Sequence, residues 1–162
     1  MKPTIYFLDD QIGQGKPKVI RGLANRLILE ASNLNMTIRP LDISNDLVYV
    51  IETEHLNIGL MSHETPQQAP KNLIHFLEGE NCKVIFCSSV LKQELNKAIA
   101  NLVTNSGYQS VYLKSAFSSL FQLEQLLSYE VSKLLEIVKI SIDYCNKRQE
   151  KSSNILHEVK AI

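Results

Sequence analysis

Two adjacent carboxylates, Asp9 and Asp10, follow the apolar segment 4–8 near the start of the chain. Two like charges side by side repel each other unless a cation or a base joins them, so the pair is suited to hold a hard cation such as Mg²⁺. A strand that ends in acids and leads into a helix places them at the carboxyl end of a parallel sheet, where open α/β sheets have their binding sites. The pair is therefore the first candidate for a functional site.

Hydroxyl and ammonium groups follow two further apolar segments in the same way. Segment 83–87 ends in Ser88 and Ser89, and segment 110–113 ends in Lys114. The carboxyl ends of parallel strands meet at one edge of a sheet, so we expect these groups near the acidic pair. Hydroxyl and ammonium groups bind phosphoryl oxygens. The pattern thus predicts a polar site for a phosphoryl group.

The elements that position these groups follow from hydrophobic periodicity. Short apolar runs alternate with amphipathic stretches, which predicts a doubly wound α/β fold with five parallel strands and helices on both faces. Pro40 marks the second strand as weak or as an edge strand. Segment 47–51 fits either a strand or a short buried helix. The five expected strands are 5–8, 36–43, 58–61, 83–87 and 110–113.

The last predicted helix, residues 119–148, is unusually long. It contains no Gly or Pro, and at 1.5 Å per residue it would extend ~45 Å. A small domain cannot cover so long an apolar stripe, so we expect the distal half to project and to pair with a second copy. The expected organisation is a domain at 1–128, an extension at 129–148 and a tail at 149–162. The expected dimer contacts are Leu127, Val131, Leu134 and Val138.

Composition excludes several classes of protein. The 162 residues are 44% hydrophobic and 21% charged, which is typical of a soluble globular domain. Seventeen basic and seventeen acidic side chains balance, so nothing indicates nucleic acid as a partner. No apolar run is long enough for a membrane span, and the three cysteines form no C-x-x-C motif. We expect a cytoplasmic protein without a zinc site.

The spacing of these groups resembles the receiver domain of two-component response regulators over residues 4–128. Segment 6–11 is similar to the first strand of that family and its Mg²⁺-binding acidic pair. Segment 84–89 is similar to the fourth strand with its switch hydroxyl, and Lys114 to the lysine after the fifth strand. The resemblance implies a flavodoxin-like sheet of order 2-1-3-4-5 and a signalling role.

The phosphoacceptor aspartate of that family is missing. Pro66 lies four residues after Ser62, which places a serine at the acceptor position. In a second register, segment 47–51 is the third strand and Glu52 or Glu54 lies near the site. A serine cannot form the acyl phosphate of a receiver. The resemblance therefore implies a non-catalytic pseudo-receiver that holds Mg²⁺ weakly if at all, with a second copy, a signalling protein or an appended output domain as partner.

A second resemblance gives an alternative function. Segment 10–18 is similar to a degenerate phosphate loop of the ParA/MinD-like ATPases, with Gly13, Gly15 and Lys16 in matching places. Pro17 replaces the hydroxyl residue that binds Mg²⁺, and Gln11 replaces the signature lysine. The alternative is therefore a degenerate nucleotide-binding protein. A serine hydrolase is disfavoured because no Gly-x-Ser-x-Gly elbow surrounds Ser62.

Overall fold

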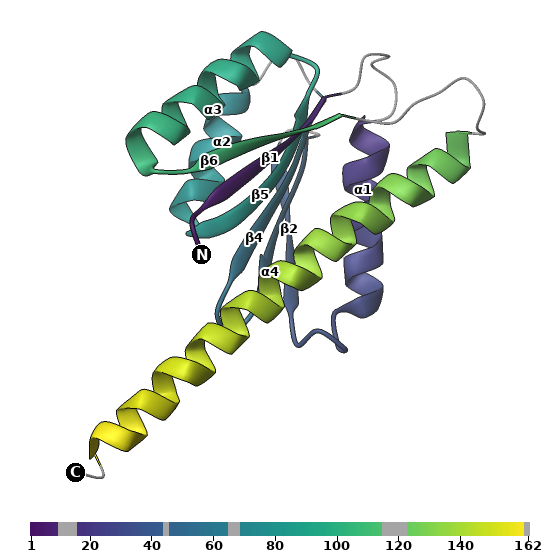
Figure 1. Ribbon diagram of the computed structural model, residues 1–162. Helices are drawn as coiled ribbons and strands as arrows, with labels where there is room; N and C mark the ends of the chain where they lie inside the picture. Colours follow the sequence, from purple (N-terminus) through teal and green to yellow (C-terminus); the bar gives the residue numbers. More distant parts are fainter. Residues whose placement is uncertain (10–15, 44–45, 65–68, 115–122, 161–162) are drawn as a thin grey trace.

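The computed structural model is a three-layer α/β domain (Figure 1). It describes residues 1–9, 16–43, 46–64, 69–114 and 123–160. Helices α1 (Lys16–Glu30) and α4 (Leu123–Lys160) cover one face of the sheet, and α2 (Pro70–Gly79) and α3 (Lys92–Ser106) cover the other. The described strands are β1 (Thr4–Asp9), β2 (Thr37–Ile43), β3 (Asp46–Glu52), β4 (Asn57–His63), β5 (Cys82–Ser89) and β6 (Gln109–Lys114).

The sheet is mixed, in the order β2-β3-β4-β5-β1-β6. Strands β4, β5, β1 and β6 are parallel, whereas β3 is antiparallel to both of its neighbours. The α/β class is therefore confirmed, but the expected five parallel strands in the order 2-1-3-4-5 are wrong. Segment 47–51 forms a strand, and the connections before and after it are too short for a parallel crossover, so it must run antiparallel.

Two cores lie on the two faces of the sheet. Along β5, Val84 and Phe86 pack into the core under α1 and α4, while Ile85 and Cys87 pack into the core under α2 and α3. Burial on both faces explains why the central strands are apolar at nearly every position. Among the described strands, β2 and β6 form the sheet edges, as Pro40 predicted for β2.

Helix α4 packs on its own chain rather than leaving its apolar stripe free. Leu134 and Val138 are fully buried in the core with α1, and a Cβ on Gly22 would lie only 2.8 Å from Cγ2 of Val131. Nζ of Lys139 lies 2.9 Å from Oε2 of Glu30 on α1. Leu134 and Val138 therefore belong to the core of their own chain, covered by α1 and the sheet, and Val131 is partly buried against that core. The expected pairing with a second copy stays a prediction. The side chain of Leu127 lies outside the described part.

The body of the fold extends further along α4 than the expected boundary at residue 128. Ile142 is still 4% exposed, whereas every described side chain from Asn146 to Lys151 is exposed. The C-terminal part of the helix then projects past the end of the sheet (Figure 1). No helix in the described part of the chain combines the length and apolar character needed to span a membrane.

Candidate functional site

The carboxyl ends of the four parallel strands lie at one edge of the sheet. Asp9 at the end of β1 pairs in register with Lys114 at the end of β6. Ser62 at the end of β4 pairs in register with Ser88 at the end of β5. The predicted site residues therefore share one edge, but β5 separates Ser62 from the strand that carries Asp9. Asp10 lies outside the described residues.

One pair of hydroxyls lies on the side of the sheet that α1 covers. Ser88 Oγ donates a hydrogen bond to Ser62 Oγ at 3.2 Å, and Ser62 Oγ donates to Oε1 of Glu64 at 3.4 Å. The same Oε1 lies 3.6 Å from Nη2 of Arg21 on α1. Ser62 is 0% exposed and Ser88 is 1% exposed. These hydroxyls are therefore engaged inside the protein rather than presented to a ligand.

A second pair lies on the side that α2 and α3 cover. Nδ1 of His63 lies 2.8 Å from Oγ of Ser89, and the same oxygen accepts the N–H of Leu91 at 2.9 Å. The carbonyl of His63 accepts the N–H of Val90 at 3.1 Å. The pair thus fixes the turn from β5 into α3. The sequence analysis singled out Ser89 but missed His63 as its partner. Residues 62–63 and 88–89 occupy equivalent positions at the ends of their strands, and this equivalence could have indicated the pairing.

Glu54, the second choice for the acceptor position, lies at the opposite edge of the sheet. Because β3 runs antiparallel to β4, the turn after β3 lies near Asn57, where β4 begins. Glu52 is likewise far from Ser62 and pairs with Arg39 at 3.2 Å. The second register is therefore wrong. The antiparallel direction of β3 was the property that the sequence left open.

Metal and thiol chemistry gain no support from the described side chains. In the described ranges, no three His, Cys, Asp or Glu residues cluster closely enough to hold a metal ion. Burial raises the pKa of the Cys82 thiol to about 12 and raises the pKa of Cys87 as well. A thiol with a raised pKa is a poor nucleophile at neutral pH, so both cysteines act as packed core residues.

A topological switch point lies between β1 and β5. Helix α1, which follows β1, packs on one face of the sheet, and α3, which follows β5, packs on the other. The connections therefore leave the carboxyl ends of these two neighbouring strands toward opposite faces, and open α/β sheets bind ligands at such a position. Lys16 is the first residue of α1, the helix that follows β1.

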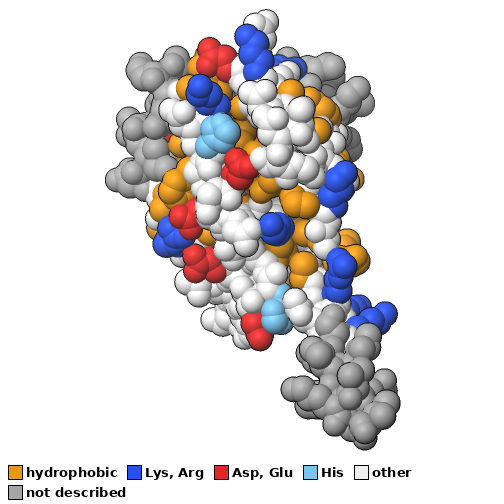
Figure 2. Space-filling view, turned by 90° about the vertical axis from the view of Figure 1, so that its left-hand side faces the viewer, with side chains coloured by type: hydrophobic (Ala, Val, Ile, Leu, Met, Phe, Trp, Pro, Cys, Tyr) orange, Lys and Arg blue, Asp and Glu red, His pale blue; other side chains and the backbone are white. Residues whose placement is uncertain are grey.

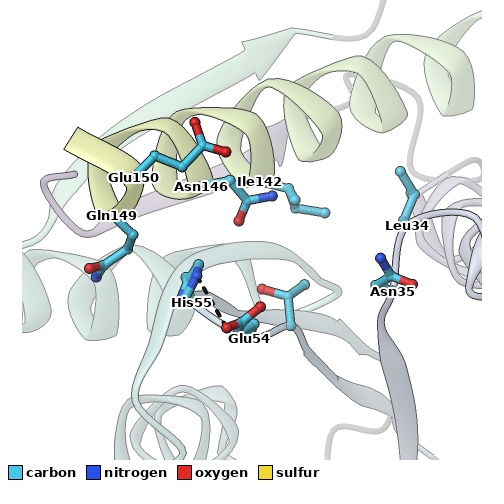
Figure 3. Close-up of a pocket in the computed structure, with 9 residues that line it drawn as sticks. Leu34, Asn35, Glu54, His55, Ile142, Asn146, Gln149 and Glu150 are labelled. Atoms are coloured by element: carbon cyan, nitrogen blue, oxygen red, sulfur yellow. Dashed lines mark ion pairs between the residues drawn. The ribbon is translucent and has the colours of Figure 1, made fainter. Parts of the chain in front are cut away.

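A cavity of about 720 Å³ lies at the opposite edge, under the distal part of α4 (Figure 3). Its floor comes from Leu34 and Asn35 after α1 and from Thr53–His55 after β3. Its wall comes from α4 through Ile142, Asn146, Gln149 and Glu150. Nε2 of His55 lies 3.6 Å from Oε1 of Glu54. We name this cavity the α4 groove.

Comparison with known proteins assigns no family. A scan against protein-family models finds no match, and searches of curated proteins and of solved structures find none. Function is therefore inferred from the strand order, the positions of charged and polar groups, and the sequence of the segment after β1.

Proposed function

We propose that the chain is a non-catalytic regulatory module that binds the phosphate groups of a nucleotide at the carboxyl ends of β1 and β5. The position of Lys16 carries this proposal. It begins α1 at the switch point, directly after the segment that contains Gly13 and Gly15. The free N–H groups and the positive dipole end of a helix favour phosphate, and a lysine there adds a full charge.

The strand order favours this proposal over the receiver-like one. A receiver sheet of order 2-1-3-4-5 places the acceptor strand beside the acidic strand, whereas β5 lies between β4 and β1 here. The hydroxyls of Ser62 and Ser88 are also bonded to each other and to Glu64. The receiver-like role therefore lacks the neighbouring strands that its site requires, while the strand, glycine segment and helix of a phosphate loop follow one another in order.

Hydrolysis is not part of the proposal. Phosphate-loop ATPases hold Mg²⁺ through a Ser or Thr after the lysine and through a further aspartate. Pro17 occupies the first place, and the neighbouring strand β5 ends in Ser88 and Ser89 rather than in a carboxylate. We expect nucleotide binding that depends little on Mg²⁺ and releases no phosphate.

Calorimetric titration with ATP, ADP and tripolyphosphate, in EDTA and in Mg²⁺, tests the proposal. We expect ATP to bind under both conditions and Lys16→Ala to lower its affinity at least tenfold, which is about 1.4 kcal/mol. Lys18→Ala is the matched control, because Lys18 is an exposed lysine in the first turn of the same helix, two residues after Lys16. Phosphate release is measured in parallel.

Three results would overturn the proposal. One is the absence of binding at millimolar nucleotide. Another is an equal loss in both lysine variants, which would indicate a general charge effect. The third is Mg²⁺-dependent phosphate release lost in Lys16→Ala, which would make the chain an enzyme.

A further inference from the structure

The distal part of α4 carries two oppositely charged surfaces. The first is the α4 groove, in which Glu54 and Glu150 supply carboxylates and Asn35, Asn146 and Gln149 supply amides. Figure 3 shows the side chains of α4 lying opposite the turn that bears Glu54 and His55. No Lys or Arg is found among the described residues that line it. The groove is therefore suited to a positively charged occupant.

The second surface is formed by Tyr144, Lys147 and Lys151, which we name the basic stripe. The three residues are spaced three and four apart and therefore share one helix face. Together with Arg148 they line a shallow hollow of about 490 Å³. Tyr144 is 51% exposed, and both lysines are exposed. Figure 2 shows Lys and Arg side chains gathered beside the distal end of α4.

The two surfaces centre on nearly opposite sides of α4, and they adjoin where Glu150 follows Lys147 by three residues. At 100° per residue, the α4 residues of the groove and those of the basic stripe centre roughly 150° apart around the helix axis. The whole chain carries no net charge, so neither surface reflects an overall excess of one sign. A copy of the chain thus presents a basic surface and an acidic hollow on one projecting helix.

We propose that the basic stripe of one copy docks in the α4 groove of the next. A cavity of about 720 Å³ lies within the range that holds a ligand of several side chains, so it has room for a tyrosine and two lysines. The lysine ammonium groups would meet Glu54 and Glu150, and the tyrosine hydroxyl would meet the amides. A second copy is the occupant because the chain itself carries the complementary charges.

This geometry determines the kind of assembly. The contact joins two different surfaces whose centres lie on nearly opposite sides of α4, so it is heterologous and joins copies head to tail. Such contacts continue into open chains unless the rotation closes a ring. The ion pairs are exposed, so the assembly weakens as salt rises. The contact does not use the nucleotide site, which lies at the other edge of the sheet.

Sedimentation velocity of the full chain over a range of concentrations tests the proposal. In low salt, we expect the weight-average sedimentation coefficient to rise with concentration beyond that of a dimer. In high salt, we expect it to fall. Lys147→Glu/Lys151→Glu and Glu54→Lys/Glu150→Lys should each remain monomeric, because each variant places like charges on both surfaces. An equimolar mixture of the two should assemble again, because each basic surface then meets an acidic one.

The controls separate this contact from general charge effects and from misfolding. Lys71→Glu/Lys97→Glu changes the same number of charges on α2 and α3 and should assemble as the unaltered chain does. The neutral variant Glu54→Gln/Glu150→Gln, with unchanged circular dichroism, should raise the dissociation constant about tenfold. A monomer at all concentrations, assembly in either charge-reversed variant alone, or a mixture that stays monomeric would each overturn the proposal. A closed dimer insensitive to charge reversal would also overturn it and would point to exposed apolar side chains such as Ile140.

Discussion

Ser89 connects two parts of the chain that lie far apart in sequence. Its hydroxyl accepts the N–H of Leu91 just before α3 and bonds Nδ1 of His63 at the end of β4. Ser89 is 4% exposed and His63 is 1% exposed, so water cannot easily replace either partner. Removing the hydroxyl would leave the Leu91 amide without this acceptor and the buried His63 imidazole without this contact. The free-energy cost of such losses is typically larger than the contribution of an exposed hydrogen bond to stability.

We therefore expect Ser89→Ala to lower the free energy of unfolding by about 1–3 kcal/mol. Urea titration followed by circular dichroism measures this change. Ser110→Ala on the edge strand β6 is the control, because Ser110 is exposed, and it should remain within about 0.5 kcal/mol of the unaltered chain. Equal stability of the two variants would contradict a structural role for the Ser89 hydroxyl.

The site residues illustrate what single positions can and cannot predict. Asp9, Ser62, Ser88, Ser89 and Lys114 all lie at the carboxyl ends of strands, as their places after apolar runs indicated. Which strands become neighbours is not determined locally, because helices from distant parts of the chain decide the order when they pack. The sequence therefore placed these residues at the correct edge, and only Ser62 is separated from the strand of Asp9, by β5.

At the scale of elements, the close contact between α1 and α4 determines how the longest helix is used. Gly22 lets Val131 approach the backbone of α1, and Lys139 pairs with Glu30 two turns further along both helices. The hydrogen bond from Lys139 also lowers the pKa of Glu30. An amphipathic stripe indicates that one face of a helix is buried, but it does not indicate which element buries it. The sequence therefore predicted the helix and not the element on which it packs.

Gly22→Ala tests this packing because the new Cβ would lie 2.8 Å from Cγ2 of Val131. Overpacking of this kind costs about 1–3 kcal/mol, partly offset by the higher helix propensity of alanine, about 1 kcal/mol. Val131→Ala removes the obstructing methyl groups. We therefore expect Gly22→Ala to be less destabilising in the Val131→Ala background than in the unaltered chain, as measured by a double-mutant cycle of urea unfolding.

Additive effects in that cycle would indicate that Val131 does not contact α1. A contact made only with a second copy would also make the stability depend on protein concentration. Unfolding midpoints at two concentrations provide that control, and we expect them to agree.

At the scale of the whole molecule, the two ends of the sheet are assigned different tasks. The carboxyl edge carries the switch point between β1 and β5, and Lys16 begins the helix that follows β1. The opposite edge carries the α4 groove, where the helix leaves the body. The alternation of strands and helices predicted the layers, and Pro40 predicted one edge. That segment 47–51 forms the strand β3 was not predictable, because a short apolar run has no periodicity that separates strand from helix.

Truncation after Arg148 separates these two tasks. The described side chains from Asn146 onward are exposed, and the end of α4 projects from the body, so few stabilising contacts are removed. We expect the free energy of unfolding to change by less than about 0.5 kcal/mol, as for surface substitutions. Nucleotide binding should persist, whereas head-to-tail assembly should be lost with Glu150 and Lys151.

Truncation after Val138 is the contrasting variant, because it removes the buried Ile142 and should destabilise the fold by about 2–5 kcal/mol. A marked loss of stability in the longer fragment would mean that the distal helix packs against its own chain. Assembly retained in that fragment would mean that Glu150 and Lys151 do not form the contact between copies.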